Sequence, residues 1–306
     1  MRLILCIVFF ASLASAQQQS PSIKQKVLWD KLNETVKEVD RSLDGVMGVA
    51  VVDLGDENSR ILLRADEVFP TASSIKIAVL VELYRQAQSG KLKLEDIYTV
   101  QSTDLVPDSE IMESLSPGIT KVTLRDLASM MVVASDNSAT NVLIDRIGME
   151  NVNATLRSMG FTHTKLQRKM MDLKAASEGR ENLASPRELL QLLQDVYQGK
   201  VLNKEMTAEF FQMLSKHKIS FLPRGLPEDL KIANKPGELE GVRNDCGIVF
   251  VPNRPYGICV MTSYLRREHD GEDAISRISV ATYQMFDRLG RASEYGRVIS
   301  PGNSSK

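Results

Sequence analysis

The sequence predicts an α/β protein of the α+β type, with one antiparallel five-stranded sheet and an inserted all-helical domain. Strand-like runs of β-branched residues lie near both ends of the chain, at residues 46–54, 61–69, 230–234, 246–251 and 258–264. The intervening residues 92–213 are mostly helix and loop. We therefore expect N- and C-terminal helices to cover the sheet, and the active site to lie between the sheet and the helical domain.

The predicted helices carry apolar residues at every third or fourth position. In residues 22–44 this spacing involves Leu28, Leu32, Val36, Val39 and Leu43. The same reasoning predicts helices at residues 73–88, 123–134, 141–147, 187–197 and 274–289. Gly90 is expected to end the helix at residues 73–88 by taking a left-handed backbone conformation. Thr123 and Asp126 form a capping pattern at the start of the helix at residues 123–134.

The chain divides into four kinds of segment. Residues 1–16 contain an apolar run followed by Ala14-Ser15-Ala16, which predicts a cleaved signal peptide and export to the periplasm or the exterior. We assign residues 17–70 and 214–292 to a discontinuous sheet domain and residues 71–213 to a helical domain. Residues 293–306 are predicted to be a flexible tail. No membrane attachment is expected after cleavage, and a monomer is expected.

The composition excludes several classes of function. A net charge of −1 gives no sign of the excess of basic residues that is typical of nucleic-acid-binding proteins. The three histidines stand far apart, which argues against a zinc site and against a Ser-His-Asp relay. Cys6 would leave with the signal peptide. Cys246 and Cys259 could pair or remain buried thiols, and we favour thiols because the connecting turn does not place them opposite each other.

Ser73 and Lys76 form a Ser-x-x-Lys motif where a strand-like run passes into a helix. Positions i and i+3 share a helix face, so the lysine amine can reach the serine hydroxyl. A lysine in a dry, cationic pocket loses proton affinity and can act as a base. The motif alone is weak, since Ser215-Lys216-His217-Lys218 is a second copy, for which we favour a solvated helix end.

Two further motifs could complete a nucleophilic site. Ser135-Asp136-Asn137 lies in a short break between helices, where Ser135 could shuttle a proton and Asn137 could hold a substrate amide. A helix cap and turn is the simpler interpretation of that motif. Lys235-Pro236-Gly237 follows a strand-like run, and its proline predicts a sheet edge. An extended amide substrate could dock along that edge, although an ordinary turn would give the same pattern.

Together, the three motifs resemble the trio of the serine β-lactamase and penicillin-binding superfamily, Ser-x-x-Lys, Ser-Asp-Asn and Lys-Thr-Gly. Their order and spacing are most similar to class A β-lactamases, and the likeness covers residues 22–290. The resemblance implies acylation of Ser73, with Lys76 and Ser135 relaying its proton. It also implies that Lys235 binds the substrate carboxylate, and that the backbone N–H groups of Ser73 and Glu238, the latter directly after Gly237, form an oxyanion hole.

The chain departs from that family at three positions. Pro236 replaces the hydroxyl residue of the third motif, and we consider either compensation by Arg243 or a surface role for that arginine. Met170 stands where the deacylating glutamate is expected, and Lys174 replaces an asparagine. Asp172 is the nearest acid and could be a water base or a loop ion-pair partner. Glu178 and Glu181 are further candidates.

These observations predict a class A-like serine hydrolase that opens β-lactam rings through a Ser73 acyl-enzyme and deacylates slowly. A D-alanyl-D-alanine carboxypeptidase-like hydrolase of wall peptides is the first alternative, and a β-lactam-binding sensor without turnover is the second. The expected partners are therefore β-lactam antibiotics or D-alanyl-D-alanine peptides. The superfamily's mechanism requires no metal or organic cofactor.

Overall fold

The computed structural model describes residues 23–293 and 295–298. The predicted signal peptide and most of the predicted tail lie outside these residues. Within the described part of the chain, no helix combines the length and hydrophobicity that a membrane span needs.

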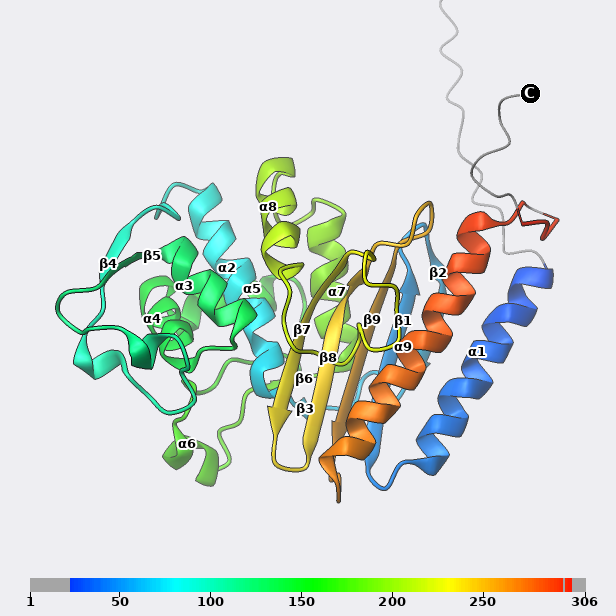
Figure 1. Cartoon of the computed structure of the whole chain (residues 1–306), viewed down its shortest axis with the longest axis horizontal. Helices are drawn as coiled ribbons and strands as arrows, with labels where there is room; N and C mark the ends of the chain where they lie inside the picture. The colour runs from blue at the N-terminus through cyan, green and yellow to red at the C-terminus, as the bar shows by residue number, and fades with distance from the viewer. Residues whose placement is uncertain (1–22, 294, 299–306) are drawn as a thin grey trace, which may run out of the picture.

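A five-stranded antiparallel sheet forms the centre of the molecule, as predicted (Figure 1). Its strand order is β2-β1-β9-β8-β7, so β7 is an edge strand, which the proline in the third motif also predicted. The strands are β1 (Val46–Asp53), β2 (Asp56–Leu63), β7 (Ile232–Leu239), β8 (Val242–Val249) and β9 (Tyr256–Ser263).

Helices cover both faces of the sheet. On one face α1 (Ile23–Ser42) packs beside α9 (Glu268–Arg291) (Figure 1). Their apolar residues and one face of the sheet form a separate core, in which Trp29 meets Phe286 edge-on with ring centroids 5.5 Å apart. On the opposite face α7 (Pro186–Tyr197) packs against β1, β8 and β9. The terminal helices therefore cover the sheet as expected.

The inserted helices lie beside the β7 edge (Figure 1). They are α2 (Lys76–Gln88), α3 (Leu124–Val133), α4 (Asn137–Ile147), α5 (Met149–Ser158), α6 (Leu173–Ser177) and α8 (Lys204–Leu214). Short elements connect them: β3 (Phe69–Pro70), η1 (Ala72–Ile75), β4 (Ile97–Thr99), η2 (Ser102–Asp104), η3 (Met112–Ser114), β5 (Lys121–Thr123) and β6 (Leu183–Ala184). One apolar core runs from these helices onto the sheet, so the two parts brace each other.

Several predicted boundaries are confirmed and others are wrong. The capping box at Thr123 and Asp126 is present, and Gly90 has the left-handed φ of +73° expected of a stop. The second strand, however, ends at Leu63 rather than at residue 69, because Arg64 takes a φ of +42° that breaks the extended backbone. Strand β7 is longer than predicted and includes Pro236, which an edge strand tolerates.

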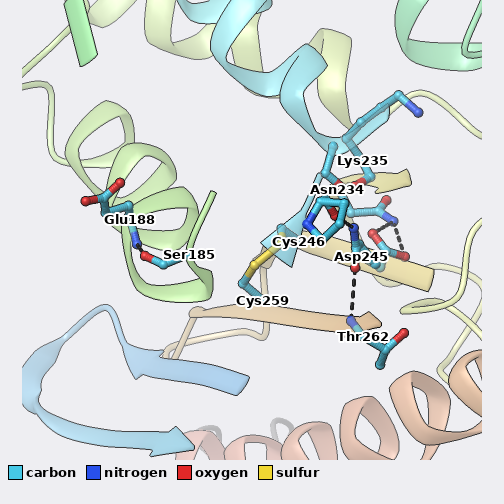
Figure 2. Close-up of a disulfide and its surroundings, with 11 residues drawn as sticks. Ser185, Glu188, Asn234, Lys235, Asp245, Cys246, Cys259 and Thr262 are labelled. Carbon is cyan, nitrogen blue, oxygen red and sulfur yellow. Dashed lines mark hydrogen bonds between the residues drawn. A yellow bond between two sulfur atoms is a disulfide. The ribbon is translucent and has the colours of Figure 1, made fainter. Parts of the chain in front are cut away.

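Cys246 and Cys259 form a disulfide, so the predicted thiols are wrong. The register of β8 and β9 pairs these two residues directly, with Cα atoms 4.0 Å apart. Our expectation failed because the 250–255 connection brings the strands into a register that the turn sequence did not reveal. Lys235 pairs with Cys246 on the next strand, and cross-strand partners share a face. The disulfide therefore supports the sheet directly beside Lys235 (Figure 2).

We predict that reduction of this disulfide destabilises the protein. The closed loop spans a sequence separation of 13 residues, for which the entropic model gives a loss of about 3 kcal/mol. Urea unfolding of protein that starts at residue 17 should show the lower stability with reductant present. The Cys246→Ala/Cys259→Ala variant should be insensitive to reductant. Equal midpoints for oxidised and reduced wild-type protein would contradict the prediction.

Candidate active site

A cleft of about 700 Å³ opens where the helical block meets the β7 edge. Its wall brings together five of the predicted site residues from three distant segments, namely Ser73, Ser135, Asn137, Lys235 and Glu238. The site therefore lies at the junction that the sequence predicted, with polar groups converging in one concave region.

Ser73 lies in η1, and Lys76 begins α2 directly after it. The Lys76 backbone N–H donates to the Ser73 carbonyl, which closes a tight turn and leaves the two side chains on one face. Thr71 fixes the entry to this turn, because its backbone N–H donates to the Asn182 carbonyl at 2.9 Å. The serine side chain thus meets the cleft at the N-terminal end of a 13-residue helix, where the helix dipole favours negative charge.

The hydroxyl of Ser135 lies between two buried lysines. Lys76 Nζ is 3.0 Å from Ser135 Oγ, and Lys235 Nζ is 3.1 Å from the same oxygen. Each lysine is only 1% exposed. Burial lowers the pKa of Lys76 well below its usual value, and the nearby charge of Lys235 lowers it further. Burial also lowers the pKa of Lys235, to about 7. A neutral Lys76 can therefore accept a proton, and Ser135 can pass it onward.

The turn that carries Ser135 is held by Asp136, which makes the helix cap that the sequence allowed as the simpler interpretation of this motif. The buried Asp136 carboxylate accepts hydrogen bonds from the backbone N–H groups of Ala139 at 2.9 Å, Met112 at 2.9 Å and Ile111 at 3.1 Å. These bonds cap α4 and tie the turn to the neighbouring loop. Ser135 itself has a left-handed φ of +55°, a conformation that persists where the surroundings fix it.

Asn137 contributes to the same group. Its Oδ1 accepts from Lys76 Nζ at 3.0 Å, and its Nδ2 lies 3.4 Å from the Pro107 carbonyl. The side chain therefore orients the lysine and lines the cleft, and its contact with a substrate amide stays a prediction.

Strand β7 approaches η1 closely at Gly237. A Cβ at this position would lie 2.5 Å from the Thr71 carbonyl oxygen and 2.9 Å from the Ser74 backbone nitrogen. Ser74 Oγ also donates to the Lys235 carbonyl at 3.2 Å across the same junction. Only glycine permits this contact, which brings the backbone at Glu238 next to the segment that carries Ser73.

Arg243 lies outside the cleft wall. Its Nε is 3.2 Å from Glu272 on α9, and its Nη1 donates to the carbonyls of Leu239 and Val242. These contacts occupy the guanidinium group on the face of the sheet that α1 and α9 cover. The structure therefore brings Arg243 within 3.9 Å of the Glu238 carboxylate, but does not place it in the cleft wall with Ser73, Ser135 and Lys235.

The loop acids that were candidates for a water base also lie outside the cleft wall. Asp172 is exposed and caps α6, because its carboxylate accepts from the Ala175 backbone N–H at 2.9 Å. Glu178 pairs with Arg180, and Glu181 pairs with Arg168 at 3.0 Å. Met170 lines the cleft together with the loop residues Arg168, Met171, Leu173 and Asn182, and its backbone is held on both sides by the Asn141 side chain.

The cleft also contains charged residues that the sequence analysis did not select. Asp108 and Glu110 contribute carboxylates to its wall, and Arg168 and Lys218 contribute cations. Lys218 belongs to the second Ser-x-x-Lys copy, where the only signal in the sequence was the motif itself. Among the described residues, no group of three or more His, Cys, Asp or Glu side chains is placed to hold a metal ion.

A family model described as the β-lactamase enzyme family matches residues 30–286 of this sequence. The chain belongs to the β-lactamase enzyme family. This β-lactamase-family chain is 27% identical to β-lactamase SME-1 of Serratia marcescens, over 90% of the chain and 92% of SME-1. The class A resemblance inferred from the three motifs is thereby confirmed at the level of the family.

Solved structures support the same assignment. A reconstructed ancestral class A β-lactamase superposes with a TM-score of 0.77 at 27% identity, covering 83% of this chain and all of that one. A mutant of PBP-A in an acyl-enzyme complex with penicillin G gives a TM-score of 0.76 at 26% identity, covering 86% of this chain and 97% of that one. The class A fold predicted from the motif order is confirmed.

We predict that Gly237→Ala disrupts this β-lactamase-family site. The added methyl must push β7 away from η1, at an overpacking cost of about 1–3 kcal/mol. Labelling of Ser73 by a fluorescent penicillin should slow by about 10-fold or more. Gly55→Ala is the matched control, since its Cβ would approach only the Asp53 side chain, at 3.3 Å. Equal labelling rates for the two variants would contradict the prediction.

Proposed function

We propose that this protein is a class A-type serine β-lactamase that opens the lactam ring through an acyl-enzyme at Ser73. The observation that carries this proposal is the position of the Ser135 hydroxyl within reach of both Lys76 and Lys235. No histidine takes part, because a lysine with a lowered pKa supplies the base.

Acylation uses the groups that line the cleft. Lys76 takes the Ser73 hydroxyl proton as Ser73 Oγ attacks the lactam carbonyl carbon. The N–H groups of Ser73 and Glu238 stabilise the oxyanion. The carbon–nitrogen bond then breaks, and Ser135 passes a proton to the departing nitrogen. Asn137 contacts the side-chain amide of the substrate, and Lys235 attracts its carboxylate.

Deacylation is the step for which the site is poorly equipped. Clearing the ester needs a water molecule held against a base, and such a base contributes about 10²- to 10⁴-fold. The candidate acids of the loop are used in a helix cap and in ion pairs, and none of the loop residues that line the cleft, the thioether Met170 among them, carries a carboxylate. We therefore infer slow turnover.

We predict that benzylpenicillin leaves a persistent adduct on Ser73. Intact-protein mass spectrometry should show the adduct for many minutes in wild-type protein and no adduct in Ser73→Ala. Met170→Glu should shorten the adduct lifetime by about 10²-fold or more, because it supplies a carboxylate beside the ester. Met170→Gln is the matched control. Prompt clearance by the wild-type protein would refute slow deacylation while leaving acylation intact.

A second candidate function is D-alanyl-D-alanine carboxypeptidase-like hydrolysis of wall peptides. It uses the same acylation groups with a different acyl donor. The cleft wall favours this alternative at one point, Met170, because a slow release of lactams is no disadvantage to an enzyme whose own substrate is a peptide. A β-lactam sensor that acylates once is the limiting case of the same argument.

We predict that the protein turns over nitrocefin more than once per molecule and faster than it releases D-alanine from a D-alanyl-D-alanine peptide. Burst kinetics in both assays at the same protein concentration give the comparison, with Ser73→Ala as the blank. A larger steady-state rate on the peptide would favour the carboxypeptidase. A single stoichiometric burst without a following phase would favour the sensor.

The location proposed for this activity is outside the cytoplasm, as the signal-like residues 1–16 suggest. The substrate class agrees with this proposal, because wall peptides and β-lactams are met in that compartment. A disulfide between Cys246 and Cys259 also suits an oxidising environment.

A further inference from the structure

Two buried lysines line the cleft without a carboxylate partner. Lys235 donates to Ser135 Oγ and to the Pro236 carbonyl at 3.0 Å. Lys218 is 9% exposed and donates to the carbonyls of Leu214 at 2.8 Å and Lys216 at 2.7 Å. All these acceptors are neutral oxygens, whereas buried cations in proteins are ordinarily paired with anions.

The third N–H group of the Lys218 ammonium makes only a long hydrogen bond. Its remaining contact is Asn234 Oδ1 at 3.5 Å. The acid whose charge acts on both lysines is Asp245, but its carboxylate already accepts from the backbone N–H groups of Phe221 and Leu222 and from Asn234 Nδ2. Asp245 therefore moderates the two positive charges from a distance and does not neutralise either one by contact.

The other cations considered for this end of the cleft are already paired. Arg168 also lines the cleft, but Glu181 accepts from two of its nitrogens, at 3.0 and 3.2 Å. Arg243 pairs with Glu272 and lies outside the wall. Pro236 has no hydroxyl to offer. Lys218 is thus the residue beside Lys235 that can add positive charge to a bound anion.

We propose that Lys218 is a specificity-determining residue that, together with Lys235, binds the carboxylate of the acyl donor. This inference rests on the proposed acylation of Ser73 and assigns the second cation to Lys218 rather than to Arg243. Burial lowers the pKa of Lys218 to about 8, as expected of an ammonium group that has no anionic contact. A bound carboxylate supplies that contact, so the site selects donors that carry an anion next to the scissile amide.

The test compares benzylpenicillin with its uncharged methyl ester. Rates of Ser73 acylation are measured for both compounds by mass spectrometry. Lys218→Gln should slow acylation by the acid about 10- to 100-fold, the range expected for loss of a hydrogen bond to a charged group. The rate with the ester should change less than about threefold. Lys216→Gln, an exposed lysine two residues away, should leave the acid-to-ester ratio unchanged.

Each result has one interpretation. An equal loss with acid and ester in Lys218→Gln would mean that Lys218 supports the fold only, and would overturn the inference. A selective loss in Arg243→Gln with none in Lys218→Gln would also overturn it and would return the role to Arg243. Failure of both compounds to label the wild-type protein would instead refute the proposed function itself.

A second variant avoids any effect on folding. Ile219 lines the cleft beside Lys218 and is 85% exposed, so a polar side chain there is tolerated. Ile219→Glu would place a competing carboxylate next to the ammonium group, whereas Ile219→Gln would not. The acid-to-ester ratio should fall about 10-fold in Ile219→Glu relative to Ile219→Gln. Identical ratios in these two variants would contradict the inference.

Discussion

The position of one hydroxyl between two buried ammonium groups is the constraint on which this site depends. Lys76 and Lys235 both lie within hydrogen-bonding distance of Ser135 Oγ, and each is almost completely buried. Burial and mutual repulsion disfavour two full charges in such a place. The pKa of both lysines is lowered as a result, which is the property that the proposed base beside Ser73 requires.

The fold holds these groups through three independent attachments. The start of α2 is fixed by the close approach of Gly237 to η1, the Ser135 turn by the Asp136 carboxylate, and the β7 edge by its ladder to β8. The disulfide strengthens that ladder on the face that carries Lys235. Because the attachments use different elements, no single loop movement separates the three catalytic segments. Such pre-organisation is what electrostatic catalysis requires.

Much of this arrangement could be predicted from the sequence, because the three motifs each carry a local reason for their chemistry. The alternation of helix and strand gave the sheet and its covering helices, and Pro236 identified the edge strand. What could not be predicted depends on register and on distant partners. Cys246 faces Cys259 only because of the β8–β9 register, and Arg243 turns away because Glu272 on α9 attracts it. The place of Lys218 in the cleft wall could not be predicted, because the sequence around it shows only a Ser-x-x-Lys motif, which recurs by chance.

The loop at Met170 shows that acylation and deacylation make opposite electrostatic demands on the same few residues. Asn137 and Asn141 lie one turn apart on α4, so the amide that holds Lys76 Nζ and the amide that holds the Met170 backbone belong to one face. A carboxylate at position 170 would provide a water base but would also raise the pKa of Lys76 by attraction. A thioether adds no such attraction, so the lowered pKa of Lys76 is kept. In the proposed mechanism, a thioether at this position therefore favours formation of the ester at the expense of its release.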